Sequence, residues 1–141
     1  MRQTSDDILT RIYRYVKATE LAETISGEVI KGKDRKVNSR AEDIVIKILA
    51  NHLAQRQEAY VNVNIYVPDV ESDGHFEKND TRCNELERLS MDLLEVFWVG
   101  TARVTCEEQQ TYAVANGREH VINNKLLFTI ENSNKNAKRD N

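Results

Sequence analysis

The densest group of potential metal ligands in the sequence lies in PDVESDGHFEKND, residues 68–80. Counted from Asp69, the carboxylates of Asp69, Glu71 and Asp73 fall on the first three side-chain ligand positions of an EF-hand calcium loop. Gly74 then falls where an EF-hand requires glycine, and Asp80 falls on the last ligand position. A calcium-binding loop is therefore the first chemical hypothesis for this segment.

The neighbouring residues argue against an EF-hand. A calcium loop of that kind lies between two helices, whereas AYVNVNIYVPD, residues 59–69, predicts a strand that ends at Pro68. Its last ligand position holds Asp80 and not the bidentate glutamate. We therefore expect a long solvated loop, with Asp80 or Thr81 capping the next helix, and no metal site. The alternative is a calcium-binding module or small enzyme that uses the Asp69–Asp80 loop.

Catalytic chemistry finds little support in the residue types and their spacing. The sequence contains no GxSxG motif, and neither Cys83 nor Cys106 has a histidine nearby in sequence to activate it. His52, His75 and His120 lie in polar segments, where we expect ordinary exposed side chains. The five glycines are spread singly, so no glycine-rich phosphate loop exists. We expect buried, unpaired thiols, no catalytic residues and no cofactor.

A second charged segment, KGKDRKVNSR over residues 31–40, has a local net charge of +4, whereas residues 68–80 have −4. Its cations are Lys31, Lys33, Arg35, Lys36 and Arg40. A small nucleic-acid-binding factor that uses Lys31–Arg40 is a second alternative. The overall charge of −3 and the lack of aromatic residues among the lysines argue against it. A solvated or protein-binding loop is the expectation for this segment.

The elements that position these segments belong to one domain. The 141 residues are 40% hydrophobic and 30% charged, which is typical of a globular domain with one core. No apolar run reaches the roughly 18 residues of a membrane span. The N-terminus lacks an apolar stretch with a cleavage site, so cytoplasmic synthesis is expected.

The first half of the chain predicts one helix followed by three strands. Thr4 or Ser5 can cap a helix that runs to about Thr19 or Glu23, with Asp6 and Asp7 in its first turn. Its apolar residues recur at helical spacing: Ile8, Ile12, Tyr15 and Val16. GEVIKG and DIVIKILA then read as strands. In the strand over residues 59–69, one side chain in two should face a core: Val61, Val63, Ile65 and Val67.

The second half predicts a helix and three more strands. Leucines at helical spacing indicate an amphipathic helix from about Arg82 to Trp98, stopped by Gly100. ARVTCEE, QTYAVAN and KLLFTIEN read as strands, with a turn at Asn116-Gly117. The resulting order α-β-β-β-α-β-β-β predicts an α+β fold over residues 1–132, a mainly antiparallel sheet flanked by two amphipathic helices. Residues 133–141 are predicted to form a flexible polar tail.

With these elements placed, the chain resembles the small tail-completion, or tail-terminator-type, proteins of tailed phages and prophages. The resemblance covers about Ser5 to Asn132 and is most specific in EDIVIKILA followed by AYVNVNIYVPDV. It implies a non-enzymatic structural protein whose copies form a ring, typically a hexamer, that caps the tail tube and meets the head-side connector. It also implies a place in the bacterial cytoplasm or the virion, and long charged loops that serve as assembly surfaces.

In a ring of identical subunits, the two charged segments could form the two complementary sides of each interface. Each interface in such a ring is heterologous, so one side of a subunit must complement the other side of its neighbour. A basic segment on one edge and an acidic segment on the opposite edge would meet this need. The expected interaction residues are Lys31, Lys33, Arg35, Lys36, Arg40, Asp69, Glu71 and Asp73.

Overall fold

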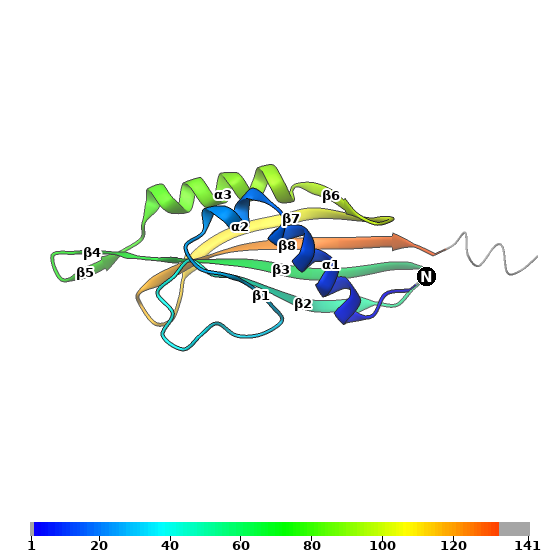
Figure 1. Cartoon of the computed structure of the whole chain (residues 1–141), viewed down its shortest axis with the longest axis horizontal. Helices are drawn as coiled ribbons and strands as arrows, with labels where there is room; N and C mark the ends of the chain where they lie inside the picture. Colours follow the sequence, from blue (N-terminus) through cyan, green and yellow to red (C-terminus); the bar gives the residue numbers. More distant parts are fainter. Residues whose placement is uncertain (1, 133–141) are drawn as a thin grey trace, which may run out of the picture.

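The computed structural model describes residues 2–132, and the predicted polar tail over 133–141 lies outside this range. The described chain forms one six-stranded sheet with helices packed against it, and a separate two-stranded hairpin that projects from one end (Figure 1). Four of the five strand pairings in this sheet are antiparallel, and only β1 pairs with β2 in parallel. The α+β class and the mainly antiparallel sheet that the sequence predicts are confirmed.

Two long central strands organise the sheet. The strand order is β1-β2-β3-β8-β7-β6, and β3 and β8 pair along their whole lengths from Arg56↔Glu131 to Pro68↔Glu119. The bounds of the six strands, in sheet order, are Val29–Lys31, Ile44–His52, Arg56–Pro68, Glu119–Glu131, Ala102–Ala113 and Val96–Val99. Both edge strands are short, which limits unwanted pairing with other chains.

The core lies between the sheet and its helices. As predicted, alternate residues of β3 are fully buried: Val61, Val63, Ile65 and Val67. The helix α1, Ser5–Lys17, buries Ile8, Ile12 and Val16 against them. Its predicted cap is confirmed, because Thr4 Oγ1 accepts from Asp7 N–H while the Asp7 carboxylate accepts from Thr4 N–H.

Two short features extend this core. A second helix, α2 at Glu20–Thr24, follows α1 and buries Leu21. Tyr15 of α1 stacks on Phe97 with ring centroids 3.8 Å apart, and its hydroxyl donates to the Leu93 carbonyl. These contacts tie α1 to the end of α3 and to the edge strand β6.

The helix α3, Asp80–Leu94, is shorter than predicted at its C-terminus. Residues Val96–Val99 form strand β6 and not a last helical turn, because a β-branched and aromatic run favours a strand. Gly100, with φ of 64°, occupies the turn that leads into β7. The predicted cap is also wrong by one or two positions, since Asn79 accepts from Arg82 N–H.

Strand β7 replaces two strands that the sequence predicts. ARVTCEE and QTYA form one continuous strand, and the register shifts between Cys106 and Glu108. This bulge reverses the alternation of inward and outward side chains, so the hydrophobic pattern breaks although the strand continues.

Residues 70–77 form a hairpin in place of the predicted solvated loop. Strands β4, Val70–Ser72, and β5, His75–Glu77, pair across a two-residue turn. Asp73 and Gly74 have φ of 50° and 79°, the values of a type I′ turn, for which Asp-Gly is a preferred sequence. We refer to this hairpin, residues 70–77, as the arm.

No helix within residues 2–132 combines the length and the apolar composition needed to cross a membrane.

Candidate functional site

One face of the sheet lacks a helical cover in the described part of the chain. The core residues of every long strand point toward α1 and α3, so the alternate residues point the other way. The middle of this uncovered face is polar: Asn64 and Asn123 lie opposite each other on β3 and β8, and Asn123 donates to the Asn64 amide oxygen at 2.7 Å. We call this surface the open face.

Large apolar side chains lie exposed on the β6 and β7 side of the open face. Val96, Trp98 and Tyr112 are 50%, 61% and 50% exposed. Trp98 lies opposite Arg103 in the strand register, so an aromatic ring and a guanidinium share this surface. This exposed surface was not expected from the sequence, since Trp98 was predicted to end a helix and instead lies in β6. The run VFWV was the signal that could have revealed it.

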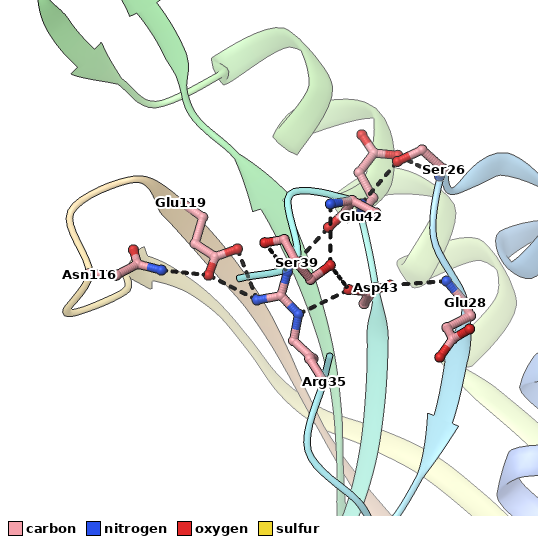
Figure 2. A network of polar contacts seen from close by, with 9 residues as sticks. Ser26, Glu28, Arg35, Ser39, Glu42, Asp43, Asn116 and Glu119 are labelled. Atoms are coloured by element: carbon pink, nitrogen blue, oxygen red, sulfur yellow. Dashed lines mark hydrogen bonds and ion pairs between the residues drawn. The ribbon is translucent and has the colours of Figure 1, made fainter. Parts of the chain in front are cut away.

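The basic segment covers the opposite end of the open face. Residues 32–43 connect β1 to β2, and Arg35 fixes them to the sheet (Figure 2). Its Nη1 donates to both carboxylate oxygens of Glu119, at 2.9 and 2.8 Å, and its Nε donates to Asp43 Oδ2 at 3.1 Å. The guanidinium also lies 4.2 Å from the centre of the Tyr66 ring.

The two carboxylates that bind Arg35 are nearly removed from water. The side chains of Arg35, Asp43 and Glu119 are 13%, 6% and 8% exposed. Asp43 also accepts from the Ser39 hydroxyl at 2.6 Å and from Glu28 N–H at 3.1 Å, as Figure 2 shows. We call Arg35, Asp43 and Glu119 the buried ion triad.

Hydrogen bonds and charge decide the protonation of the buried ion triad. Burial alone would raise the pKa of Asp43, but hydrogen bonds from Ser39, from Glu28 N–H and from Arg35 outweigh it and hold the pKa below the ordinary 3.8. Burial would lower the pKa of Arg35, and the hydrogen bonds to Glu119 and Asp43 raise it instead. Asp43 and Arg35 are therefore both charged at neutral pH.

A second ion pair ties the start of β2 to α3. Arg82 donates from Nε and Nη2 to the two oxygens of Glu42 at 2.7 and 2.8 Å, and from Nη2 to the Thr24 carbonyl. The bonds to Glu42 raise the pKa of Arg82. Gly27 is required next to these residues, because a Cβ there would overlap the Asp43 carboxylate. The basic segment is thus held at both of its ends.

Internal pairing divides the predicted basic interaction residues into two groups. Arg35 belongs to the buried ion triad, and Lys31 binds Asp6 Oδ1 at 3.3 Å and Thr10 Oγ1 at 2.9 Å. Within residues 2–132, the exposed side chains of Lys33, Lys36 and Arg40 have no ion-pair partner. Only this second group is free to meet another molecule.

The predicted acidic residues divide in the same way. Asp69 is 5% exposed in its side chain and lies 2.7 Å from His120 Nδ1. The expectation that His120 is exposed is therefore wrong, because the start of β8 places it against the root of the arm. Glu71 and Asp73 are exposed on the arm itself. These two carboxylates, and not Asp69, are available for contacts between molecules.

The two charged segments lie at the same end of the molecule. The expectation that they lie on opposite edges is wrong, because Arg40 of the basic segment and Phe76 of the arm line one shared pocket of about 570 Å³. Its full lining is Asn38, Ser39, Arg40, Pro68, Asp69, Phe76, Asn116, Arg118 and Glu119. The sheet order explains this, because the basic segment leads into the start of β2, which pairs with the end of β3, where the arm begins.

The remaining candidates for chemistry are separated from one another. Among residues 2–132, no three His, Cys, Asp or Glu side chains gather closely enough to hold a metal ion. Cys83 is buried and Cys106 half-buried, and neither forms a disulfide. Burial raises the pKa of the Cys83 thiol to about 11 and also raises that of Cys106.

The chain matches no protein-family model, and no curated protein is significantly similar to it.

Proposed function

We propose that this protein is a non-enzymatic assembly component of tailed phages or prophages, a tail-terminator-like protein. Its copies would form a ring at the end of the tail tube, where they meet the tube and the head-side connector. The observation that carries this proposal is the open face of the sheet, which leaves Val96, Trp98 and Tyr112 exposed at its side.

A sheet face with large exposed apolar side chains favours an assembly role. Single exposed apolar residues are normal on protein surfaces, but neighbouring ones rimmed by polar groups mark contacts with other proteins. Val96 and Trp98 lie two residues apart on β6, so their side chains point to the same face, where polar Thr105 and Arg103 lie opposite them on β7. Aromatic residues and arginine are enriched at such contacts, and Arg103 lies opposite Trp98.

The arm favours the same role. Its residues 70–77 are all exposed, including the apolar Val70 and Phe76 at 48% and 43%. An isolated two-stranded hairpin is marginally stable in water, so an arm that projects from the body (Figure 1) gains stability from a partner. The phage assignment itself comes from the resemblance of EDIVIKILA and AYVNVNIYVPDV to tail-completion proteins.

Gene deletion followed by electron microscopy tests the proposed function. In cells that produce the phage particles, deletion should leave heads and tail tubes unjoined, and a wild-type copy of the gene should restore complete particles. A copy that carries Trp98→Asp should restore few particles, whereas Arg88→Glu, an exposed change on α3, should restore them fully. Complete particles in normal numbers after deletion would contradict the proposal.

A further inference from the structure

The pocket between the basic segment and the arm contains two carboxylates that are bonded within the subunit. Glu119 accepts from Arg35 and from the Asn116 amide, the latter at 2.8 Å. Asp69 lies 2.7 Å from His120 Nδ1. The side chains of Glu119 and Asp69 are only 8% and 5% exposed, so neither presents its carboxylate openly to an incoming group, although both residues line the pocket.

The two arginines of the same pocket are not neutralised. Arg40 and Arg118 are exposed, and within residues 2–132 neither guanidinium has a carboxylate partner. Arg118 lies 5.5 Å from the Phe76 ring, which holds its guanidinium at the root of the arm. The pocket thus presents two exposed positive groups, with Lys33 and Lys36 on the adjoining segment.

The arm has the complementary charge. Its tip presents Glu71 and Asp73, and within the described residues neither carboxylate has a hydrogen-bond or ion-pair partner. The arm is fixed by its two-residue turn and points away from the body of the subunit (Figure 1). A copy therefore cannot place its own arm tip in its own pocket.

We propose that the pocket lined by Arg40 and Arg118 receives the acidic tip of the arm of a second copy of this chain. This inference rests on the proposed self-assembly and names one contact within it, separate from the contacts of the open face. Guanidinium groups bind carboxylates in planar, charge-assisted hydrogen bonds, so arginine suits this pocket better than lysine. Phe76, which belongs to the receiving subunit's own arm, provides an apolar wall.

Disulfide trapping between two differently substituted chains tests this contact, even where association is weak. One chain carries Ser72→Cys at the arm tip, and the other carries Val37→Cys, a 90% exposed position beside the pocket. Both carry Cys106→Ser, and Cys83 stays because it is buried. The initial rate of interchain disulfide formation with oxidised glutathione is measured after mixing the two proteins.

The matched control replaces the second chain by one with Arg88→Cys, an exposed position on α3. The Ser72 and Val37 pair should crosslink about tenfold faster than the control pair, because docking raises the effective concentration of the two thiols. Adding Arg40→Glu and Arg118→Glu to the receiving chain should slow the reaction by roughly 2- to 30-fold, the range for two partly exposed ion pairs.

Restoring complementary charge should restore the rate. Glu71→Lys with Asp73→Asn on the arm chain should partly recover crosslinking to the arginine-reversed chain, and Asn keeps the positive φ that the turn requires. Equal crosslinking rates for the Val37→Cys and Arg88→Cys partners would overturn the proposal that the pocket receives the arm. Rates that do not respond to the charge changes would overturn it as well. Such a result would leave the proposed function standing if gene deletion still prevented the joining of heads and tails.

Discussion

Replacing Arg35 by leucine should be the most damaging single change in the basic segment. The substitution removes the one cation that pairs with both Asp43 and Glu119, whose side chains are only 6% and 8% exposed. Breaking a buried ion pair by removing one partner costs about 3–5 kcal/mol, since a charge is left buried without compensation. The free energy of unfolding of a whole domain is about 5–15 kcal/mol, so this loss is a large share of it.

Urea unfolding followed by circular dichroism measures this loss as a fall in the midpoint. Lys36→Leu is the matched control, because Lys36 is exposed and lies next to Arg35 in sequence. It should change the stability by no more than about 0.5 kcal/mol. Arg35→Lys should have an intermediate effect, because lysine keeps the charge but cannot reproduce the bonds to both carboxylates.

Removing the stranded charges should recover part of the lost stability. Asp43→Asn and Glu119→Gln, added to Arg35→Leu, leave neutral amides in place of two uncompensated carboxylates. If Arg35→Leu were no less stable than Lys36→Leu, the buried ion triad would be stabilising nothing, and the reasoning would be refuted.

The difference in stability between wild type and Arg35→Leu should depend on pH. The pKa of Asp43 in the folded state is lowered from its ordinary value of 3.8. The ionised Asp43 carboxylate therefore stabilises the fold fully at a pH above its pKa in the unfolded state, and this stabilisation is lost as the pH falls through its pKa in the folded state. The difference in stability between wild type and Arg35→Leu should therefore be constant near neutral pH and should shrink below about pH 3.8.

Three further predictions follow from burial and from the arm. Val63→Asp should unfold the protein whereas Asn62→Asp should have a mild effect, since Val63 is fully buried and Asn62 is on the open face. Equal losses of melting temperature would mean that the assignment of the two faces of β3 is wrong. Millimolar calcium should leave the melting temperature unchanged in wild type and in Asp73→Asn, and a rise lost in the variant would restore the EF-hand hypothesis. Iodoacetamide should label Cys83 far more slowly in the native than in the urea-unfolded protein, because burial raises its pKa to about 11; equal rates would contradict that burial.

Local signals in the sequence predicted several of the regular elements. The alternation in AYVNVNIYVPD predicted the end of β3 at Pro68 and its buried face, although β3 begins earlier, at Arg56, and Thr4 with Asp7 satisfied both bonds of a helix cap. The arm was also encoded locally, in Asp73-Gly74, but comparison with a calcium loop directed attention to the carboxylates and away from the turn.

The candidate site depended on contacts that no local pattern contains. Arg35 and Glu119 are 84 residues apart in sequence and meet only because β2, β3 and β8 are neighbours in the sheet. For the same reason, a charge count could not separate Arg35 and Asp69, which are paired internally, from Arg40 and Glu71, which are exposed. The bulge after Cys106 hid the continuity of β7, since one extra residue reverses the alternation.

Self-association with burial of the open face is the central claim, and the sequence offers an intrinsic probe for it. Trp98 is the only tryptophan in the chain and lies 61% exposed on that face. Native mass spectrometry and tryptophan emission should be measured on the same samples over a wide range of concentration. We expect one closed species whose mass is a fixed multiple of 16.3 kDa, with Trp98 emission shifted to the blue as it forms. The mass of a single chain at every concentration, with unchanged emission, would contradict the claim.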